Sequence, residues 1–443
     1  MKFLEPHPTA DADPKDRPAR LGLVGIAGYA GYLGQRLTDA MADPANPRLA
    51  AMFVPDPQNH APRIDQLREL GVAFHDTYDR LLDDDLDALW LPVPIHLHRP
   101  MTQAALARGI AVMCEKPVAA TVDDVLAMRD AQRRANVPVY IGFQDIYEPA
   151  TLQLKHALLD ARQGRPLRAV VTGGWPRGSD YYRRNDWAGK LRHRDDWVLD
   201  GPAHNAMAHF INLAAFLLGT SPQDAATPTS IEAELYRAND IDSYDTFSAR
   251  VGFADGSVLT ALLTHACDRE TEPTVQVLGD RLHATWRNQH DTIDLRVDGR
   301  DRVIPRDVDG RDAMIRVLAG QQTGGPVATL DTSLAHTVIV NGAVEASRIH
   351  RIPPAACRRT FMPDKGHVLA ARGVDTALQR VAHEHKLLSE LGLFDWTQPH
   401  APLNLRNYRR FKGPKASTAK GKPTVVVTTP QVVPAKRRTT TVG

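Results

Sequence analysis

Apolar segments of four to six residues alternate with longer segments of helical periodicity over the first third of the chain. The apolar runs that are typical of buried strands are Leu21–Ile26, Leu49–Val54, Ala88–Leu91, Ile110–Cys114 and Val139–Gly142. The helical segments between them include Tyr32–Met41, Asp65–Leu70, Pro100–Arg108 and Val122–Ala135. Because strands that alternate with helices over short links form parallel sheets, the pattern predicts an α/β domain with a parallel, doubly wound sheet.

The second half of the chain changes to a strand-rich pattern. Its β-like runs are Ile231–Leu235, Thr246–Phe253, Val258–His265, Thr274–Leu278, His283–Trp286, Ile293–Val297 and Arg302–Pro305. The Asp255-Gly256 pair supplies the turn of a hairpin between the second and third runs. Helical segments follow at Asp331–Arg348 and Val374–Leu391. Successive hairpins indicate a mainly antiparallel sheet, so this part is predicted to be an α+β domain.

The length of 443 residues exceeds what one hydrophobic core usually supports, which favours two domains. We expect a disordered leader over 1–19, a first domain over 20–148, a second domain over 149–411 and a disordered basic tail over 412–443. The tail carries seven basic and no acidic residues, so subtracting seven from the net charge of +2 leaves the remainder at −5. That balance argues against nucleic acid binding by the body, although an anionic partner of the tail stays an alternative.

The chain lacks the signals of export and of membrane insertion. No run of 18 apolar residues is present, and the proline-rich, charged N-terminus has no apolar signal core. The three cysteines, Cys114, Cys267 and Cys357, are scattered and odd in number, which indicates reduced thiols rather than disulfides or a metal cage. We therefore expect a cytoplasmic protein without a bound metal and without a membrane partner.

A glycine-rich turn follows the first predicted strand and leads into the first helix. Gly25, Gly28 and Gly31 are spaced Gly-x-x-Gly-x-x-Gly, with Ala27 and Tyr29 between them. Glycines in such a turn let the backbone approach a pyrophosphate at a helix N-terminus. The stricter fingerprint has glycine where this chain has Ala27, so a purely structural strand–helix turn is the alternative. The functional interpretation is a dinucleotide site.

Asp56 follows the second predicted strand, about 25 residues after Gly31. An acid at this position can accept the ribose 2′-hydroxyl and disfavours a 2′-phosphate. Prolines flank Asp56 on both sides, so it could instead be a turn residue. The sequence thus favours NAD over NADP as the cofactor.

The sequence Glu115-Lys116-Pro117 ends the fourth predicted strand. In parallel sheets, ligands bind beyond the carboxyl ends of the strands, and Pro94 ends the preceding strand at the same edge. Lysine at a strand end is commonly a surface residue, but its occurrence together with the glycine turn favours a position in a cleft. Lys116 is therefore a candidate site residue.

An apolar helical segment, Pro202–Leu218, carries one polar face. Asn205, His209 and Asn212 lie within about 60° of one another at 100° per residue. His204 falls outside this face and is expected at the surface or at the helix start. Histidine is the common general base near neutral pH, and Asn205 could orient it. A satisfied internal histidine is the alternative.

Aromatic residues alternate with polar ones between Trp175 and Trp197, and the segment includes Arg183, Asn185 and Trp187. Such a mixture suits a polyhydroxylated ligand, with hydrogen bonds at ring edges and stacking on faces. A solvated loop is the alternative, and the arginines could instead recognise a carboxylate or phosphate.

Taken together, these motifs resemble the glucose-fructose oxidoreductase / inositol dehydrogenase / rhizopine catabolism (Gfo/Idh/MocA) family. The resemblance rests on the glycine turn, Pro94 to His98, Cys114-Glu115-Lys116-Pro117, and the helix from Ala208 to Asn212 that ends at Leu217-Leu218-Gly219. It covers roughly residues 20–350.

The resemblance implies a Rossmann domain that binds NAD or NADP and a second domain with a large open antiparallel sheet. It implies that Lys116 binds the reacting oxygen, that His209 is the acid/base, and that a cis peptide precedes Pro117. Homo-dimers or homo-tetramers formed through the sheet are also implied. The candidate cofactor contacts are Gly25, Ala27, Gly28, Tyr29, Gly31, Asp56, Pro94, His98, Glu115 and Lys116; the candidate substrate contacts are Lys116, Tyr147, Arg183, Asn185, Trp187, Asn205 and His209.

The chain departs from the family at two positions. Aspartate is common where Asn205 and Asn212 stand, and Asp200 with His204 forms a rival pair of the same spacing. We expect an NAD(P)-dependent oxidoreductase that moves a hydride to or from a sugar, cyclitol or derivative. The departures favour a non-catalytic, nucleotide-binding sensor as the alternative, and a glycosidase-like enzyme that uses NAD is a further one.

Overall fold

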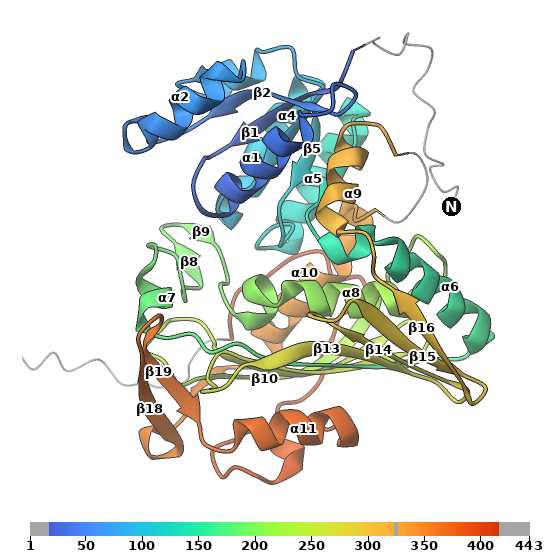
Figure 1. Ribbon diagram of the computed structural model, residues 1–443. Coiled ribbons are helices and arrows are strands. Elements are labelled where there is room, and N and C mark those ends of the chain that lie inside the picture. The colour runs from blue at the N-terminus through green and yellow to red at the C-terminus, as the bar shows by residue number, and fades with distance from the viewer. Residues whose placement is uncertain (1–16, 323–326, 416–443) are drawn as a thin grey trace, which may run out of the picture.

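The computed structural model describes residues 17–322 and 327–415 as two domains stacked on one another (Figure 1). The predicted leader and tail therefore fall mostly outside the described residues, at 1–16 and 416–443. The domain boundaries proposed from the sequence stay a prediction.

The first domain is built on a parallel sheet of six strands in the order β3-β2-β1-β4-β5-β6, which confirms the predicted doubly wound fold. The strands are β1 Arg20–Val24, β2 Arg48–Phe53, β3 Ala73–His75, β4 Ala88–Leu91, β5 Ala111–Cys114 and β6 Val139–Ile141. The helices are α1 Gly28–Ala40, α2 Ala61–Glu69, α3 Tyr78–Leu82, α4 Ile95–Ala107 and α5 Val122–Ala135. Helix α4 begins five residues before the predicted start, so Pro100 lies inside it.

The second domain contains a sheet whose strands follow the order β16-β15-β14-β13-β7-β12-β11-β10-β17, with β20 paired to β10. The strands are β7 Arg168–Gly174, β10 Pro228–Arg237, β11 Thr246–Phe253, β12 Val258–Thr264, β13 Thr271–Leu278, β14 Leu282–Arg287, β15 Thr292–Val297, β16 Arg300–Pro305, β17 Ile349–Arg351 and β20 Leu403–Asn404. The predicted mainly antiparallel sheet is confirmed. Strand β7 was missed by the sequence pattern, although it lies at the centre of the sheet and pairs in parallel with β12.

Helices cover both faces of this large sheet (Figure 1). Helices α8 (Ala208–Leu218) and α10 (Leu330–Ala346) lie between the sheet and the first domain, with α6 (Pro149–Arg162) and α9 (Gly310–Leu318) beside them. On the opposite face lie α11 (Val374–Glu384) and the hairpin of β18 (Cys357–Met362) and β19 (Gly366–Ala371). The short helix α7 (Ser179–Arg183) and the strands β8 (Arg192–His193) and β9 (Asp196–Trp197) lie at one end of the sheet, on the side of the first domain.

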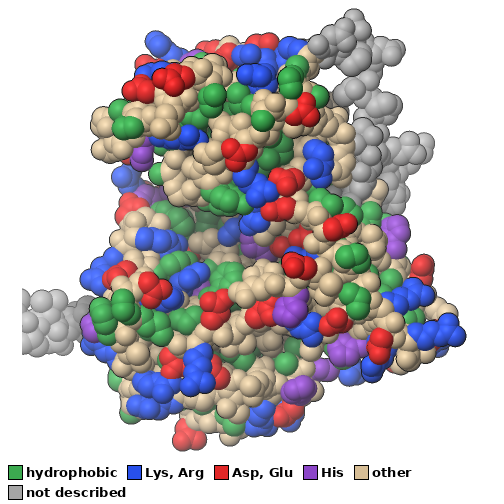
Figure 2. Space-filling view, in the orientation of Figure 1, with side chains coloured by type: hydrophobic (Ala, Val, Ile, Leu, Met, Phe, Trp, Pro, Cys, Tyr) green, Lys and Arg blue, Asp and Glu red, His purple; other side chains and the backbone are tan. Residues whose placement is uncertain are grey.

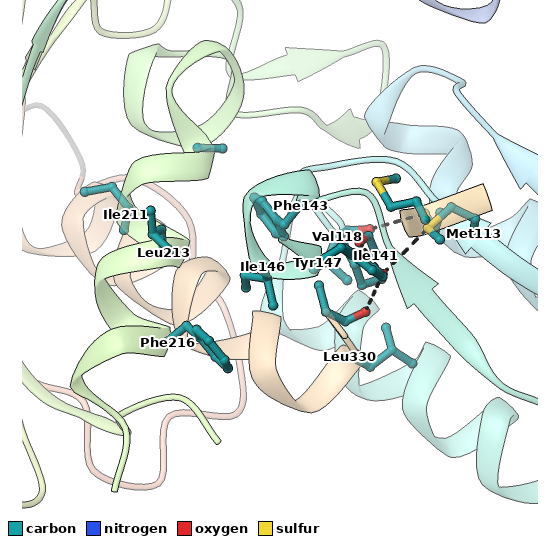
Figure 3. Packing of buried hydrophobic residues seen from close by; sticks show 14 of the residues in the cluster. Met113, Val118, Ile141, Phe143, Ile146, Tyr147, Ile211, Leu213, Phe216 and Leu330 are labelled. Carbon is teal, nitrogen blue, oxygen red and sulfur yellow. Dashed lines mark hydrogen bonds between the residues drawn. The ribbon is translucent and has the colours of Figure 1, made fainter. Parts of the chain in front are cut away.

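One hydrophobic core runs from the first domain into the second. Figure 3 shows Phe143, Ile146 and Tyr147 lying between Met113 of the parallel sheet and Phe216 of α8. The three residues between them belong to or precede the short helical turn η2, Gln144–Tyr147. Because buried side chains of both domains pack against η2, this turn fixes the position of one domain relative to the other.

Two predicted helices are shorter in the structure. The segment predicted as one helix from Pro202 consists of a π-type turn, Pro202–Ala206, and of α8, with Met207 between them in a non-helical conformation (φ −113°, ψ 23°). The segment predicted to extend to Leu391 ends as α11 at Glu384, because His385 adopts a left-handed conformation with φ +55°.

The chain from Phe411 to Lys415 is described and packs on the second domain and on α5, so the first residues after the predicted tail start at Lys412 have contacts with the domains. The backbone N–H of Phe411 donates to Asp123 (2.8 Å), and the Phe411 ring lies 5.2 Å from that of Trp197. The backbone N–H of Lys412 donates to Glu345 (2.5 Å). Among the described residues, no helix combines the length and the apolarity that a bilayer crossing requires.

Candidate active site

The glycine turn adopts the conformation that the sequence predicts for a phosphate-binding loop. Gly25 and Gly28 have φ values of +89° and +55°, which favour glycine, and a Cβ atom on Gly31 would lie 2.6 Å from the carbonyl oxygen of Ile26. A Cβ on Gly28 would meet nothing within 4 Å, so the space in front of the first turn of α1 is open. Exposed Ala27 and Tyr29 flank Gly28. An open helix N-terminus of this kind fits a dinucleotide pyrophosphate.

Asp56 lies beside the glycine turn at the same edge of the sheet. Its strand β2 pairs with β1, and the backbone N–H of Gly25 donates to Phe53 O (2.8 Å). Asp56 is exposed and precedes a short helical turn without capping it through its side chain. Its carboxylate forms no hydrogen bond or ion pair within the part of the chain that the structure describes.

Lys116 extends from the end of β5 to the π-type turn of the second domain. Its Nζ donates to the backbone oxygen of Asn205 (2.9 Å) and lies 3.4 Å from Asn205 Oδ1. The amide Nδ2 of Asn205 in turn donates to Asp200 Oδ1 (2.8 Å). Burial lowers the pKa of Lys116 below its ordinary value, against the opposing charges of Glu115 and Asp200. The peptide bond between Lys116 and Pro117 is cis.

His209 on α8 faces a carboxylate that the sequence did not indicate. His209 Nδ1 lies 3.0 Å from Oδ2 of the buried Asp145 in η2. Burial lowers the pKa of His209, and the contact with Asp145 opposes this shift. The pKa of Asp145 is lowered although burial raises it, because His209 and the guanidinium groups of Arg306 and Arg311 favour the charged form. Nδ1 is thus turned to Asp145.

Arg311 is a second residue that the sequence analysis did not identify. It is the second residue of α9, and its Nε lies 3.4 Å from the hydroxyl of Tyr29 at the start of α1. Arg36 of α1 holds α9 in place through Asp312 (2.6 Å) and Asp309 (3.1 Å). A cation from the second domain therefore stands beside the open N-terminus of α1.

The rival pair of Asp200 and His204 is not supported. His204 is fully buried rather than at the surface, and neither of its ring nitrogens has a hydrogen-bond partner among the described residues. Its ring stacks on that of His336 (5.7 Å). Asn212 is also fully buried, so only Asn205 and His209 of the predicted polar face border the cleft.

Glu115 and His98 lie behind the cofactor edge. Buried Glu115 accepts a hydrogen bond from Trp90 Nε1 (3.1 Å) and one from the backbone N–H of Lys116 (3.2 Å). The expectation for His98 needs correction, because this residue is 1% exposed and its ring nitrogens contact the backbone oxygens of Pro117 (2.9 Å) and Val93 (2.8 Å). It braces the two strand ends rather than touching a cofactor. Pro94 precedes α4 at the same edge.

The expected substrate contacts on the loops also change. Tyr147 is fully buried and donates to Ile141 O (2.9 Å), so it belongs to the core (Figure 3). Arg183 points to exposed Asp180 (3.0 Å), and Asn185 Oδ1 accepts from the backbone N–H groups of Trp187 (3.2 Å) and Ala188 (2.8 Å). The arginine that faces the site is Arg184, which lies 4.0 Å from Asp200 and over the ring of Trp187 (5.2 Å).

Residues 22–143 match the model of a family described as an oxidoreductase family with an NAD-binding Rossmann fold. A stretch of 163 residues is 31% identical to D-xylose 1-dehydrogenase (NADP(+)) 2 of Haloferax volcanii and covers 36% of this chain and 47% of that protein. A stretch of 191 residues is 25% identical to myo-inositol 2-dehydrogenase of Thermotoga maritima, covering 41% and 53%. The chain thus spans about half the length of these curated relatives.

The solved structures resemble the chain over a longer range. The WlbA dehydrogenase from Bordetella pertussis, crystallised with NADH and UDP-GlcNAcA, is 22% identical with a TM-score of 0.59, covering 73% of this chain and 94% of that chain. At this identity the likeness concerns the fold. This likeness of fold covers part of the second domain as well as the first.

Proposed function

We propose, from the match of residues 22–143 to the model of an oxidoreductase family with an NAD-binding Rossmann fold, that the whole protein is an NAD(P)-dependent dehydrogenase or reductase of the Gfo/Idh/MocA type. Its substrate would be a sugar, a cyclitol or a derivative. The observation that carries the proposal is that Lys116 and His209, from different domains, lie near each other beyond the strand ends. Lys116 Nζ bonds Asn205 (2.9 Å), four residues before His209, and the charge of Lys116 contributes to lowering the pKa of His209.

The cofactor would be held by both domains. Gly25, Gly28 and Gly31 leave room for a pyrophosphate before α1, and Arg311 would add a positive charge beside it. Asp56 would accept the ribose 2′-hydroxyl, which favours NAD. A nicotinamide bound at the strand ends would exchange a hydride with the reacting carbon of the substrate.

The acid–base work would fall to two side chains of this chain. His209 Nε2 would take the hydroxyl proton during oxidation, and Asp145 would stabilise the imidazolium that forms on the other side of the ring. The Lys116 ammonium would hold the substrate oxygen, on which negative charge builds as the hydride leaves. In the reduction direction the same groups would return the proton.

The substrate class would follow from the neighbourhood of this pair. Asn205 and Trp187 offer an amide and an aromatic face, the kinds of group that bind polyhydroxylated rings. We keep homo-oligomer formation and a cytoplasmic location as predictions. Association through the large sheet would have to use β13–β16, because α11 packs on β7 and β12.

The first test combines cofactor titration with a substrate panel. NADH and NADPH fluorescence titrations should show binding, with NADH tighter. Oxidation and reduction should then be followed at 340 nm with a panel of aldoses, inositols and their keto forms, with Lys116→Met and His209→Ala variants as controls. If neither NADH nor NADPH binds at millimolar concentration, the proposed function is refuted.

A further inference from the structure

Arg177 carries a positive charge that no acidic side chain neutralises in the part of the chain that the structure describes. The side chain is half-buried, its Nε is buried without a hydrogen-bond partner, and it forms no ion pair there. Its guanidinium lies over the rings of Tyr181 (4.8 Å) and Trp175 (5.7 Å). Aromatic faces hold the group in place without using its hydrogen-bond donors.

Arg184 occupies the same aromatic surface. Its guanidinium lies 3.6 Å from the centre of the Tyr181 ring, so Tyr181 contacts both arginines. One Nη donates to the backbone oxygen of Tyr181 (2.8 Å), and the other lies 4.0 Å from Asp200. Burial and the charges of Arg177 and Arg184 lower the pKa of nearby His265 to about 3. His265 is therefore neutral near pH 7 and adds no charge.

A continuous series of contacts joins these arginines to the proposed reaction centre. Lys116 bonds Asn205, Asn205 bonds Asp200, and Asp200 lies beside Arg184. Asp200 is the acidic group of this series, and its oxygens already accept from Asn205 (2.8 Å) and from the backbone N–H of Gly189 (2.6 Å). Lys and Arg side chains border the hollow between the domains (Figure 2). Lys116 and Arg184 thus share the partly committed carboxylate of Asp200, whereas Arg177 has no acidic partner among the described residues.

On this geometry, which extends the proposed function, we infer that the substrate is an anionic sugar derivative whose carboxylate or phosphate is bound by Arg177 and Arg184. The reacting hydroxyl lies at Lys116 and His209, and the anionic group lies at the far end of the substrate. Two guanidinium groups on a rigid aromatic support match the oxygens of such a group by forked hydrogen bonds.

A purely structural role for Arg177 explains less of the geometry. Structural arginines of this protein have partners: Arg306 forms an ion pair with buried Glu148 (2.7 Å), and Arg162 donates to Leu218 O (3.1 Å) at the end of α8. Arg177 has the aromatic support but no acceptor for its side chain among the described residues. An oxyanion from outside the chain supplies that acceptor.

The test uses two sugar series whose members differ only at C6. D-glucose, D-glucuronate and D-glucose 6-phosphate, and the matching galactose series, should be titrated calorimetrically into the full chain with and without saturating NADH. One anionic sugar should bind at least about tenfold more tightly than its neutral partner, the low end expected for a charge-assisted hydrogen bond. The carboxylate and phosphate arms distinguish the two sources of the charge.

Arg177→Met and Arg184→Met should reduce that preference to about twofold or less, and Arg183→Met, on the neighbouring exposed arginine, should leave it unchanged. Arg177→Lys keeps the charge and should keep part of the preference, which controls for misfolding of the methionine variant. Equal binding of neutral and anionic sugars, no binding of either, or a preference that survives in both methionine variants would overturn the inference. If the wild-type protein does not bind NADH at all, the proposed function itself is refuted.

Discussion

At the scale of single residues, a carboxylate stands behind each of the two proposed catalytic side chains. Asp145 contacts His209, and Asp200 reaches Lys116 through the amide of Asn205. The asparagines at positions 205 and 212, where the resemblance stated from the sequence implies aspartates, therefore do not leave the site without acids. The sequence could not indicate Asp145, because its contact with His209 depends on how η2 packs between the domains.

Replacement of Asp145 by Asn should move the acidic limb of the pH profile of kcat/KM to lower pH. Asp145 raises the pKa of His209 against the effect of burial, so removing its charge lowers that pKa further. The value of kcat should fall as well, because the imidazolium loses its counter-charge. Steady-state rates between pH 4 and 9 measure both effects. The control is Asp180→Asn, which changes an exposed acid. If Asp145→Asn lowers kcat but leaves the acidic limb at the same pH, Asp145 does not set the pKa of His209 and has only a structural role.

Lys155 links stability to pH at a distance from the site. This fully buried lysine of α6 lies 3.3 Å from the backbone oxygen of Asp224, and burial lowers its pKa to about 7. Between that value and its ordinary pKa of 10.5 the unfolded chain binds more protons at this residue than the folded chain. Folding stability should therefore rise with pH across that window, by up to about 1.4 kcal/mol per pH unit.

Urea unfolding at pH 7, 8 and 9 of the wild type and of Lys155→Met measures this contribution. The stability of the wild type relative to the variant should increase with pH. A difference that is constant or that decreases would show that Lys155 stays charged in the folded protein.

At the scale of elements, long periodic segments were predicted well and short or interrupted ones were not. The bounds of α5 and β11 coincide with the prediction. The non-helical Met207 was not predicted, because the apolar pattern continues through it while the backbone changes from a π-type turn to α8. Because of this change in the backbone, His204 does not lie at the surface but stacks on His336 in the core.

The N-terminus of α9 should contribute to cofactor affinity. Arg311 lies at the start of this helix beside Tyr29, so Arg311→Ala should raise the Kd for NADH by roughly 10- to 100-fold, the range for losing a charge-assisted hydrogen bond. Fluorescence titration provides the measurement. The matched control is Arg316→Ala, an exposed arginine on the same helix. Equal affinities of the two variants would exclude Arg311 from the cofactor site.

At the scale of the whole molecule, the fold class was predictable because it depends on strand and helix order, which the hydrophobic pattern reports. The segment after α10, from β17 to β20, was less predictable from the sequence. Its short elements pack on a sheet face that is formed by strands distant in the sequence. Buried Glu234 of β10 illustrates this, since it accepts from the backbone N–H of Ser389 (3.0 Å), 155 residues away.

Phe411 should stabilise the molecule by joining its C-terminal segment to both domains. Its ring packs on Trp197, and its N–H binds Asp123 of α5. Because truncating a buried phenylalanine costs about 3–5 kcal/mol, Phe411→Ala should lower the free energy of unfolding by about 3 kcal/mol. Calorimetric melting tests this, with Leu393→Ala at a more exposed site (37%) as the control. Identical melting curves for both variants would show that the segment does not contribute to stability.

The central claim is that Lys116 and His209 carry out the acid–base step of a nicotinamide-dependent reaction. The most direct test is kcat, followed at 340 nm on a substrate identified from the sugar and polyol panel, for the wild type, Lys116→Met and His209→Ala. We predict that each variant lowers kcat by at least about a hundredfold while the Kd for NADH stays within about twofold of the wild type. Turnover by both variants at the wild-type rate would contradict the claim.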